Sequence, residues 1–381
     1  MLGILGGLFG FFYGAEFKAW LWDLTDFPKL TQNNAEPRGS ESAPKGEEVV
    51  VQDLDIPWEL VFLPNGDMLV TERAGKLLLI NSKTKKSIEV KGVKHTGEGG
   101  LLGLALHPKF AENRLLYLYF TYESGGQIFN KVVRYEFTVI RLAVACLDGD
   151  PDCGLPTPRL SSERVVLDGI AGSSNHDGGR IAFGPDGYLY IGTGDAESPQ
   201  LAQDTNSLNG KILRVKDDGS IPEDNPFGNA VYSYGHRNVQ GLAWDSSGQL
   251  WATEHGPSGL ETGKDELNKI EKGINYGWPD SKGDTVKEGT VAPVVHSGKD
   301  TWAPSGMVIV GSKIYFAGLR GEAVYGYDLG SKKPSTHFKG EYGRIRTVVG
   351  GPNSDLYILT NNTDGRGTPK SGDDKIVRVK F

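Results

Sequence analysis

A hairpin pattern that occurs six times is the feature that most limits the possible folds of this chain of 381 residues. Each copy has an apolar run, a turn with Gly, Ser or Asn, and a second apolar or aromatic run, as is typical of β-hairpins. The copies are LVFLPNGDMLVTE (60–72), LALHPKFAENRLLYLYF (104–120), IAFGPDGYLYIGTG (181–194), LAWDSSGQLWATE (242–254), MVIVGSKIYFAGL (307–319) and VVGGPNSDLYILT (348–360). Repeated hairpins favour a ring of blades that bury their faces against one another. We therefore predict an all-β fold, a six-bladed β-propeller of four-stranded antiparallel blades, over residues 49–381.

Composition agrees with this fold and excludes several classes of protein. The chain contains 53 Gly residues, about twice the usual share, without the G-X-Y period of collagen. Its formal net charge of -7 argues against nucleic acid as a partner, because nucleic-acid-binding proteins usually have a basic surface. The two cysteines, Cys146 and Cys153, are too few for a disulfide framework or a four-cysteine zinc site. We expect them to form one disulfide bond, with a pair of free thiols as the alternative.

The N-terminal segment differs from the rest of the chain. Residues 2–15 form an apolar stretch without a charge, which is too short to favour a membrane span but fits the hydrophobic region of a signal peptide. We expect residues 1–30 to be a signal or membrane-anchor segment and residues 31–48 to be a polar linker. The protein is then expected to be exported (periplasmic or extracytoplasmic), with a membrane tether as a further expectation. No Lys or Arg precedes the apolar stretch, so the start of a cytosolic chain is the alternative.

The repeat also predicts where a functional site would lie. The residues just before the first strand and just after the second strand of a hairpin lie at the same end. All six hairpins of a propeller point the same way, so these positions converge on one mouth of the central channel. They are Pro57, Trp58, Thr71, Glu72, Arg73, Glu98, His176, Asp195, His236, Arg237, Asn238, Glu254, His255, Trp302, Leu319, Arg320, Arg344, Arg346, Asn361 and Asn362. Because most are polar, we expect a binding or catalytic site there.

Four arginines at this mouth suggest an anionic ligand. They are Arg237, Arg320, Arg344 and Arg346. At close range they would repel one another unless an anion lay between them, and guanidinium groups bind carboxylate or phosphate in a bidentate manner. The alternative is that they pair with local acids on the faces of their strands.

His176 is the candidate general base at this mouth. It stands in the small-residue loop SSNHDGGR, and a neutral imidazole can accept a proton near pH 7. A carboxylate such as Asp195 would hold its tautomer and raise its basicity. His236 and His255 are the next candidates, and a purely structural role for a loop histidine is the alternative.

An acidic, Gly-rich run over residues 254–279 suggests a site for a hard cation. Its carboxylates and loop carbonyl groups are oxygen ligands of the kind that calcium prefers. The carboxylates are Glu261, Asp265 and Glu266. A solvated acidic loop is the alternative. No HxxxH or CxxC spacing supports a transition-metal site, and neither GxxxxGK[ST] nor a GxGxxG between a strand and a helix supports a nucleotide site.

Five motifs in collinear order carry a resemblance to a known family. They are GEGGLLGLALHP (97–108), SNHDGGRIAFGPDGYLYIGTGD (174–195), GHRNVQGLAW (235–244), EHGP (254–257) with DELNKIEKGINYGWP (265–279), and RIRTVVGGPNSDLYILTNNTDGRG (344–367). Over residues 49–381 the chain resembles the soluble glucose and aldose sugar dehydrogenases that depend on pyrroloquinoline quinone (PQQ). That family also includes the propeller of hedgehog-interacting protein.

The resemblance implies an oxidoreductase that oxidises an aldose at C1 to a lactone and passes hydride to C5 of PQQ. A small-molecule aldose and an electron acceptor would be its partners. His176 resembles the base that takes the proton of the C1 hydroxyl, and Asp195 resembles the acid that supports it. Arg237, with Asn238 beside it, resembles the arginine next to the quinone carbonyl groups, where negative charge develops. The resemblance further implies that three arginines hold the carboxylates of the cofactor: Arg320, Arg344 and Arg346.

Calcium is also implied by the resemblance. The backbone carbonyl groups of Gly256 and Pro257 would bind a calcium ion that touches the quinone and polarises it. Glu266 and the backbone carbonyl group of Tyr276 would bind a second, structural calcium ion.

The chain departs from the family pattern at two expected cofactor contacts and in its loop lengths. Glu98 stands where the family commonly has a Gln, and a carboxylate beside a trianion would be unfavourable unless it were protonated or bound to metal. His255 replaces the Gln of the glucose enzymes, as in the aldose sugar subgroup. The stretch between Pro257 and Asp265 is longer than in that subgroup. The long loops of the glucose enzymes are absent, which favours an aldose enzyme of broad specificity.

Two other functions remain as alternatives. A non-catalytic propeller could bind a protein or glycan, as hedgehog-interacting protein does, but a pure binding module need not keep His176, Arg237 and the arginine pair at 344 and 346. A metal-dependent lactonase would need convergent carboxylates at the channel, whereas this mouth is rich in arginine.

Overall fold

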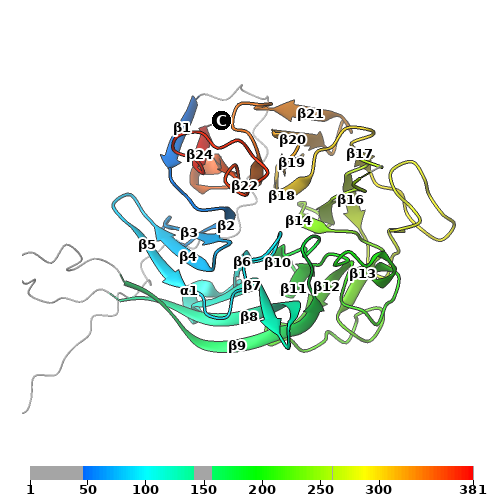
Figure 1. The fold of residues 1–381 in the computed structure, drawn as a ribbon, viewed down its shortest axis with the longest axis horizontal. Coiled ribbons are helices and arrows are strands. Elements are labelled where there is room, and N and C mark those ends of the chain that lie inside the picture. Colours follow the sequence, from blue (N-terminus) through cyan, green and yellow to red (C-terminus); the bar gives the residue numbers. More distant parts are fainter. Residues whose placement is uncertain (1–45, 141–156, 260, 381) are drawn as a thin grey trace, which may run out of the picture.

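Six four-stranded antiparallel sheets surround a central axis in the computed structural model, which describes residues 46–140, 157–259 and 261–380 (Figure 1). The predicted six-bladed propeller is therefore confirmed. Each of the six predicted hairpins forms the first two strands of a blade counted from the axis, because each combines a short connection with runs suited to strands. The predicted disulfide of Cys146 and Cys153 and the segment of residues 1–30 lie outside the described residues.

The blades follow one another along the chain. Blade 1 contains β2 (Pro57–Phe62), β3 (Met68–Glu72), β4 (Lys76–Ile80) and β5 (Lys85–Glu89). Blade 2 contains β6 (Leu101–Leu106), β7 (Leu115–Ser124), β8 (Gln127–Ile140) and β9 (Thr157–Ala171), with the short helix α1 (Phe110–Asn113) after β6. Blade 3 contains β10 (Ile181–Phe183), β11 (Leu189–Gly192), β12 (Lys211–Val215) and β13 (Val231–Tyr234). Blade 4 contains β14 (Val239–Trp244), β15 (Leu250–Glu254), β16 (Glu266–Ile270) and β17 (Val295–His296). Blade 5 contains β18 (Pro304–Val310), β19 (Lys313–Gly318), β20 (Ala323–Asp328) and β21 (Pro334–His337). Blade 6 contains β22 (Ile345–Gly350), β23 (Leu356–Thr360), β24 (Ile376–Lys380) and β1 (Gly46–Val51).

The ring closes by pairing the two ends of the described chain. β1 lies antiparallel to β24, with Glu48 opposite Arg378. Blade 6 therefore combines strands from both ends, which ties the first blade to the last. β1 begins at Gly46, so the last residues of the segment expected to be a linker belong to this sheet. None of the helices among the described residues is long and apolar enough to cross a membrane.

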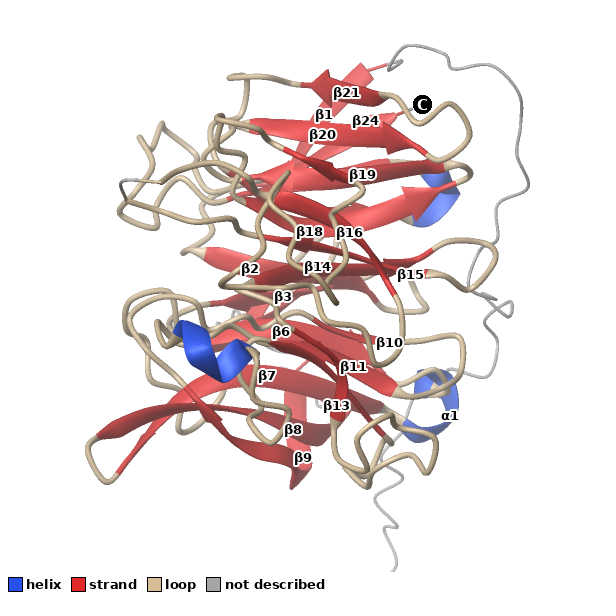
Figure 2. Ribbon diagram, turned by 90° about the vertical axis from the view of Figure 1, so that its right-hand side faces the viewer, coloured by secondary structure: helices blue, strands red, loops and turns tan. Residues whose placement is uncertain are grey.

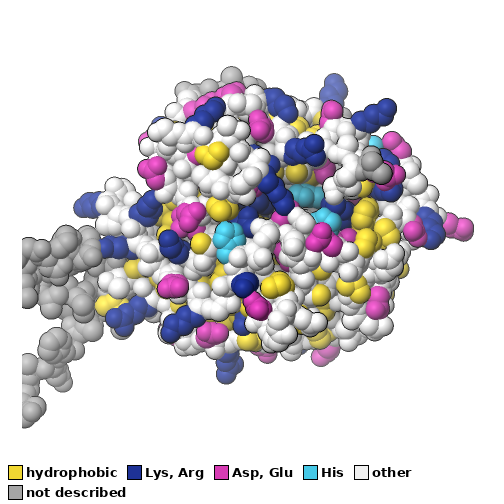
Figure 3. Space-filling model, viewed as in Figure 1, with side chains coloured by type: hydrophobic (Ala, Val, Ile, Leu, Met, Phe, Trp, Pro, Cys, Tyr) yellow, Lys and Arg dark blue, Asp and Glu magenta, His cyan; other side chains and the backbone are white. Residues whose placement is uncertain are grey.

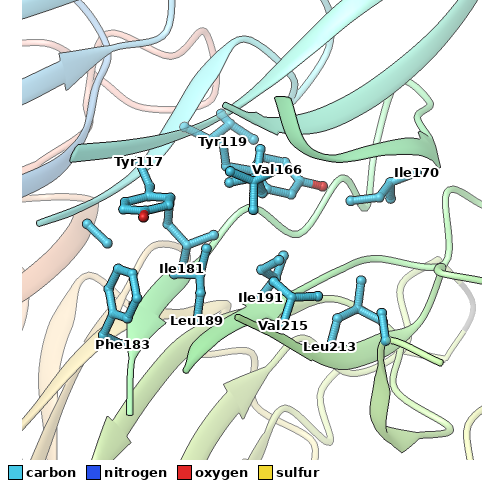
Figure 4. Close-up of a cluster of buried hydrophobic side chains, with 14 of the residues drawn as sticks. Tyr117, Tyr119, Val166, Ile170, Ile181, Phe183, Leu189, Ile191, Leu213 and Val215 are labelled. Atoms are coloured by element: carbon cyan, nitrogen blue, oxygen red, sulfur yellow. The ribbon is translucent and has the colours of Figure 1, made fainter. Parts of the chain in front are cut away.

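The hydrophobic core lies between neighbouring blades. Between blades 2 and 3, Tyr117 packs edge-on against Phe183, with the ring centroids 5.0 Å apart. Figure 4 shows these rings beside Ile181 and Leu189, all of which are buried. The first strands of successive blades contact one another, as β6 does with both β2 and β10, so these strands line the axis. Loops lie at both ends of the strands (Figure 2), and one of these ends carries the candidate site.

Candidate active site

His176 and Asp195 meet at the mouth, as predicted. His176 lies in the loop before β10, and Asp195 follows β11 of the same hairpin. The Nδ1 atom of His176 is 2.7 Å from Oδ1 of Asp195. Because an ionised carboxylate only accepts hydrogen bonds, His176 donates from Nδ1 and its Nε2 is left as an acceptor. Asp195 is fully buried, and its Oδ2 accepts a hydrogen bond of 2.8 Å from Nε1 of Trp278, whereas the His176 side chain is 16% exposed. A buried, oriented carboxylate therefore supports a histidine that solvent or a ligand can reach.

The backbone at His176 is held in an unusual conformation. Its φ is 62°, in the left-handed region that histidine rarely adopts. Its amide group donates a hydrogen bond of 3.0 Å to Oε2 of Glu98. On its other side, a Cβ atom added at Gly194 would lie 1.7 Å from the carbonyl oxygen of His176, so only glycine fits there. Contacts on both sides therefore determine where the imidazole lies.

Arg237 enters the same site from the connection between β13 and β14. Its amide group donates to Glu254 (2.9 Å), and its Nη2 donates to Oγ of Ser258 (2.9 Å). The guanidinium lies over the ring of Trp278, 5.3 Å from the centroid. Burial lowers the pKa of Arg237, although the charges of Asp195 and other acids oppose this shift. Trp278 therefore contacts both Arg237 and the carboxylate that orients His176.

Asn238 and His255 contribute buried nitrogen atoms without partners. Oδ1 of Asn238 accepts the amide hydrogen of Gly178 at 3.0 Å, while its Nδ2 has no hydrogen-bond partner. Nε2 of His255 is also buried and unpartnered. Burial lowers the pKa of His255 to about 3, which keeps it neutral at pH 7, and the charges of Arg237 and Arg346 act in the same direction.

Arg346 lies on β22 and Arg344 directly precedes this strand. Both side chains are buried. Arg344 pairs with Asp364 at 2.8 Å, so part of its charge is balanced within the chain, but its Nε has no partner. Arg346 contacts only neutral groups in its hydrogen bonds: Oε1 of Gln240 at 2.8 Å, Oδ1 of Asn361 at 3.1 Å and Oγ of Ser305 at 3.4 Å. Its Nε is unpartnered. Burial lowers the pKa of Arg346 to about 9, and the charges of Arg73 and Arg344 add to this effect.

The structure does not bring Arg320 into this group. Leu319 is buried, but the next residue, Arg320, is exposed and makes no side-chain hydrogen bond or ion pair with the described residues. Arg73 takes a place among the buried cations instead. Its Nη2 donates to the carbonyl oxygen atoms of Gly97 and Gly99, the latter at 3.2 Å, and its Nε is buried without a partner. Burial lowers the pKa of Arg73 as well.

Glu98 is neither protonated nor left without a counter-ion. Its Oε1 is 2.5 Å from Nη1 of Arg366, a residue of the loop that follows β23. Burial by itself would raise the pKa of Glu98, but the charges of His255 and Arg366 and the hydrogen bonds from Arg366 and His176 lower it to about 2. Because His255 is neutral at pH 7, the stable partner of the carboxylate is Arg366.

The region expected to hold calcium contains buried carboxylates. Asp265 accepts the amide hydrogen of Gly256 at 2.8 Å and thereby orients the buried Gly256–Pro257 segment. Glu266 lies near Glu254. Nδ2 of Asn268 donates to both carboxylates, to Glu266 at 3.1 Å and to Glu254 at 2.7 Å. Burial first, and then the charge of Glu254, raises the pKa of Glu266 to about 8.

Two further observations bear on a cation at this place. Oδ1 of Asn268 is buried without a partner, while Nδ2 of the same side chain faces the two carboxylates. Tyr276 stacks on His236 with the ring centroids 4.7 Å apart, which fixes the position of its backbone. Glu261 instead pairs with Lys282 at the surface. In the part of the chain that the structure describes, no three His, Cys, Asp or Glu side chains gather into a metal site, so backbone and amide oxygen atoms would have to complete one.

Sequence reasoning missed two residues of this site. Trp278 stands in the YGWP motif and Arg366 in the TDGRG motif, both of which are in long connections outside the hairpins. Both residues lie within motifs of the family resemblance. The repeat does not predict that they belong to the site, because it does not show the path of these connections. An aromatic residue or arginine inside a Gly-rich loop beside predicted mouth residues was the available signal.

Seen from the mouth, the molecule is hollowed at its centre, and Lys, Arg and His side chains gather around the hollow (Figure 3). Side chains from different blades converge near His255. Its pKa is affected by the charges of Glu98, Arg237, Arg346 and His176. The fold and the site together define a propeller whose mouth presents buried cationic side chains beside an oriented histidine.

Comparisons with known proteins agree with this class. A family model described as Glucose / Sorbosone dehydrogenase matches residues 54–370, so the chain belongs to the glucose/sorbosone dehydrogenase family of enzymes. Aldose sugar dehydrogenase YliI of Escherichia coli is 33% identical over 363 residues, which cover 84% of this chain and 90% of the relative. The solved PQQ-bound form of aldose sugar dehydrogenase from Streptomyces coelicolor is 41% identical with a TM-score of 0.77, and the match covers 89% of this chain and 99% of that one. Quinoprotein glucose dehydrogenase B of Acinetobacter calcoaceticus is 32% identical over 62% of this chain and 53% of the relative.

Proposed function

We propose that this enzyme oxidises aldose sugars at C1 to lactones with PQQ as its redox cofactor. The observation that carries this proposal is the position of the His176–Asp195 pair among buried arginines, three of which leave Nε without a hydrogen-bond partner. The similarity to a dehydrogenase solved in its PQQ-bound form names the cofactor.

The residues at the mouth fit a carboxylate-bearing quinone. Nε of Arg73, Arg344 and Arg346 is buried without a partner, as are Nε2 of His255 and Nδ2 of Asn238. Leaving a buried polar atom unpaired costs about 1–3 kcal/mol, so a ligand with several acceptor oxygen atoms would relieve a sizeable cost. Arg344 and Arg346 would hold carboxylates of the cofactor, and Arg237 and Asn238 would lie beside its carbonyl groups. The exposed side chain of Arg320 would hold a further carboxylate.

His176 carries the proton transfer in this proposal. When bound, PQQ supplies an electrophilic quinone that accepts two electrons with a hydride from the sugar. Nε2 of His176 takes the proton of the C1 hydroxyl, because Nδ1 is already committed to Asp195. The imidazolium that forms is stabilised by the Asp195 carboxylate, which Trp278 holds in place. Arg237 provides fixed positive charge where negative charge develops, at no cost of reorganisation during the reaction.

Calcium is part of the proposal. The carbonyl groups of Gly256 and Pro257 would bind one calcium ion, and Glu266 with the carbonyl group of Tyr276 would bind another. The unpartnered Oδ1 of Asn268 and the hydrogen bond from Gly256 to Asp265 support these places.

Reconstitution tests cofactor, metal and reaction together. Purified protein is incubated with PQQ and calcium and then assayed with glucose and an artificial electron acceptor. We expect sugar-dependent reduction of the dye that is lost when calcium is removed with a chelator. Absence of sugar-dependent reduction over a range of temperatures would overturn the assignment. Calorimetry separates the main alternative, because a non-catalytic binding module would show no calcium-dependent binding of PQQ.

The proposal includes the location of the enzyme and its electron acceptor. We infer an exported enzyme that passes electrons from the sugar to a separate acceptor. Fractionation of cells that express the full chain, with and without residues 1–30, tests export and any membrane tether.

A further inference from the structure

Glu98 connects three loops that are far apart in the sequence. It precedes β6, and its Oε2 accepts the amide hydrogen of His176 at 3.0 Å. Its Oε1 is 2.5 Å from Nη1 of Arg366, which comes from the loop after β23. Nη2 of the same guanidinium donates to Oδ1 of Asn175 at 2.9 Å. Arg366 therefore holds both the carboxylate and the residue before His176.

The hydrogen bond to Glu98 acts at a strained point of the backbone. A left-handed conformation at a residue other than glycine costs about 1–3 kcal/mol and persists only where its surroundings enforce it. At His176 the enforcing contacts are Glu98 on the amide side and the close approach of Gly194 on the carbonyl side. A rotation of this backbone would swing the imidazole away from Asp195.

We propose that Glu98 is a positioning residue for His176: its carboxylate holds the backbone of the base in the left-handed conformation, and Arg366 fixes that carboxylate. The catalytic part of this inference rests on the proposed function, in which His176 is the base. The arrangement also accounts for an acid beside an expected anionic cofactor, because Arg366 balances its charge.

A carboxylate suits this position better than an amide. Both oxygen atoms of Glu98 accept hydrogen bonds, one from a backbone amide and one from a guanidinium. A glutamine could offer an oxygen atom to only one of these donors and would turn its NH2 group toward the other. The substitution Glu98→Gln therefore sets a donor against a donor while preserving the size of the side chain.

The test compares Glu98→Gln, Glu98→Ala and the double variant Glu98→Gln/Arg366→Gln. Glu197→Gln is the matched control, because Glu197 holds the same loop through Asn175 (3.1 Å) and Ser173, whereas the amide group of His176 bonds to Glu98. The first readout is amide hydrogen exchange of the peptide that spans residues 172–180, measured without cofactor. The second is kcat and KM for glucose with PQQ and calcium at saturation, and the third is the Kd of PQQ by calorimetry.

We expect Glu98→Ala to speed exchange in this peptide and to lower kcat about 100-fold, as a displaced catalytic group commonly does. KM and the Kd of PQQ should change less than about threefold, because the binding groups remain. Glu98→Gln should lower kcat about tenfold, and the double variant should recover part of that loss, since it removes the donor that opposes the amide at position 98.

Three outcomes would overturn the inference. One is unchanged exchange in Glu98→Ala. Another is a loss confined to the Kd of PQQ, which would make Glu98 a cofactor-binding residue. The third is an equal loss of kcat in Glu197→Gln, which would indicate general loosening of the loop. If the wild-type protein oxidises no sugar, the proposed function fails, and the exchange measurement still decides whether Glu98 holds the backbone of His176.

Discussion

Two buried arginine regions of this propeller show opposite electrostatics. Arg214 lies at the end of the blades away from the mouth, beside a cavity of about 370 Å³ between blades 3 and 4. Its Nε and Nη2 bond to Asp186 at 3.0 and 2.9 Å, and its Nη1 bonds to Asp224 at 2.8 Å. The guanidinium also lies over the ring of Tyr188, 4.3 Å from the centroid. Burial alone would lower the pKa of Arg214, but hydrogen bonds to Asp224 and Asp186 raise it.

At the mouth, Arg346 differs from Arg214 in its polar partners and in the direction of its pKa shift, although its guanidinium also lies over an aromatic ring, that of Trp58, at 5.6 Å. Arg346 has only neutral hydrogen-bond partners, its Nε has none, and burial lowers its pKa to about 9. Arg214 forms direct ion pairs with two acids, whereas none of the described acids forms an ion pair with Arg346, on which Asp364 and Glu98 act only at a distance. Burial of an arginine therefore does not by itself indicate a ligand site. A buried arginine without an ion-pair partner does. The predictions below test this difference, and each variant should be measured for both turnover and thermal unfolding.

The largest effect is expected for His176→Asn. The variant keeps a polar side chain but removes the base, so turnover should fall by about 10²–10⁴-fold. The Kd of PQQ should stay close to that of the wild type, because the arginines remain. Steady-state kinetics with saturating PQQ and calcium, beside calorimetry, measures both quantities. Undiminished turnover would remove His176 as the base.

Arg346→Met should weaken PQQ binding about 100-fold, since a charged hydrogen bond contributes roughly 1.5–3 kcal/mol. Without cofactor the variant should be as stable as the wild type or more stable, because an unbalanced buried charge has been removed. The folded pKa of Arg346, about 9, lies below its usual 12.5, so its burial costs stability below about pH 9 and less as the pH rises further.

Without cofactor, the gain in stability of Arg346→Met over the wild type should therefore be largest near pH 7 and smaller toward pH 10. Thermal unfolding of both proteins at these two pH values measures it. A loss of stability at pH 7 would show that Arg346 is balanced within the chain after all.

Arg214→Met should act in the opposite way. Removing the guanidinium leaves Asp186 and Asp224 without their partner, which we expect to lower the free energy of unfolding by about 1–3 kcal/mol. Both acids are partly exposed, so water limits the loss. Turnover and PQQ affinity should not change. Urea unfolding and the glucose assay check this, and a drop in turnover in the folded variant would contradict the division between the two regions.

The smallest effect is expected for Asp177→Asn, at the buried residue that follows His176. Oδ1 of Asp177 accepts from Asn130 (3.0 Å) and from the amide group of Ser173 (3.2 Å), but the buried Oδ2 has no partner. Burial raises the pKa of Asp177 to about 6, with a further contribution from the charge of Glu98. Folding therefore favours the protonated acid, and stability is lost as the pH rises through about 6.

The asparagine cannot ionise, so the variant should unfold roughly 2–4 °C above the wild type at pH 8 and close to it at pH 4. Thermal unfolding at the two pH values gives the comparison. An equal difference in unfolding temperature between variant and wild type at both pH values would show that ionisation of Asp177 does not limit stability.

Much of the fold and part of the site could be predicted from residues alone. The hairpin repeat predicted the number of blades, and the shared end of each hairpin predicted that His176 would meet Asp195 across 19 positions of sequence. The same rule placed Arg320 with the arginines at the mouth, but its side chain is exposed whereas theirs are buried. The reason is local: Leu319 turns into the core and the next side chain turns out to solvent, and a difference of one residue reverses the direction of a side chain at the end of a strand.

The amino-acid sequence by itself determined the hairpins, their number and the end at which their polar residues gather, because turns and strand patterns act between neighbouring residues. Only the tertiary structure decided which charges are balanced. Arg366 reaches Glu98 across 268 positions, and Trp278 reaches Asp195 across 83, through connections whose course depends on how whole blades pack. Pairing at such distances follows from the closure of the ring, and no local pattern records it.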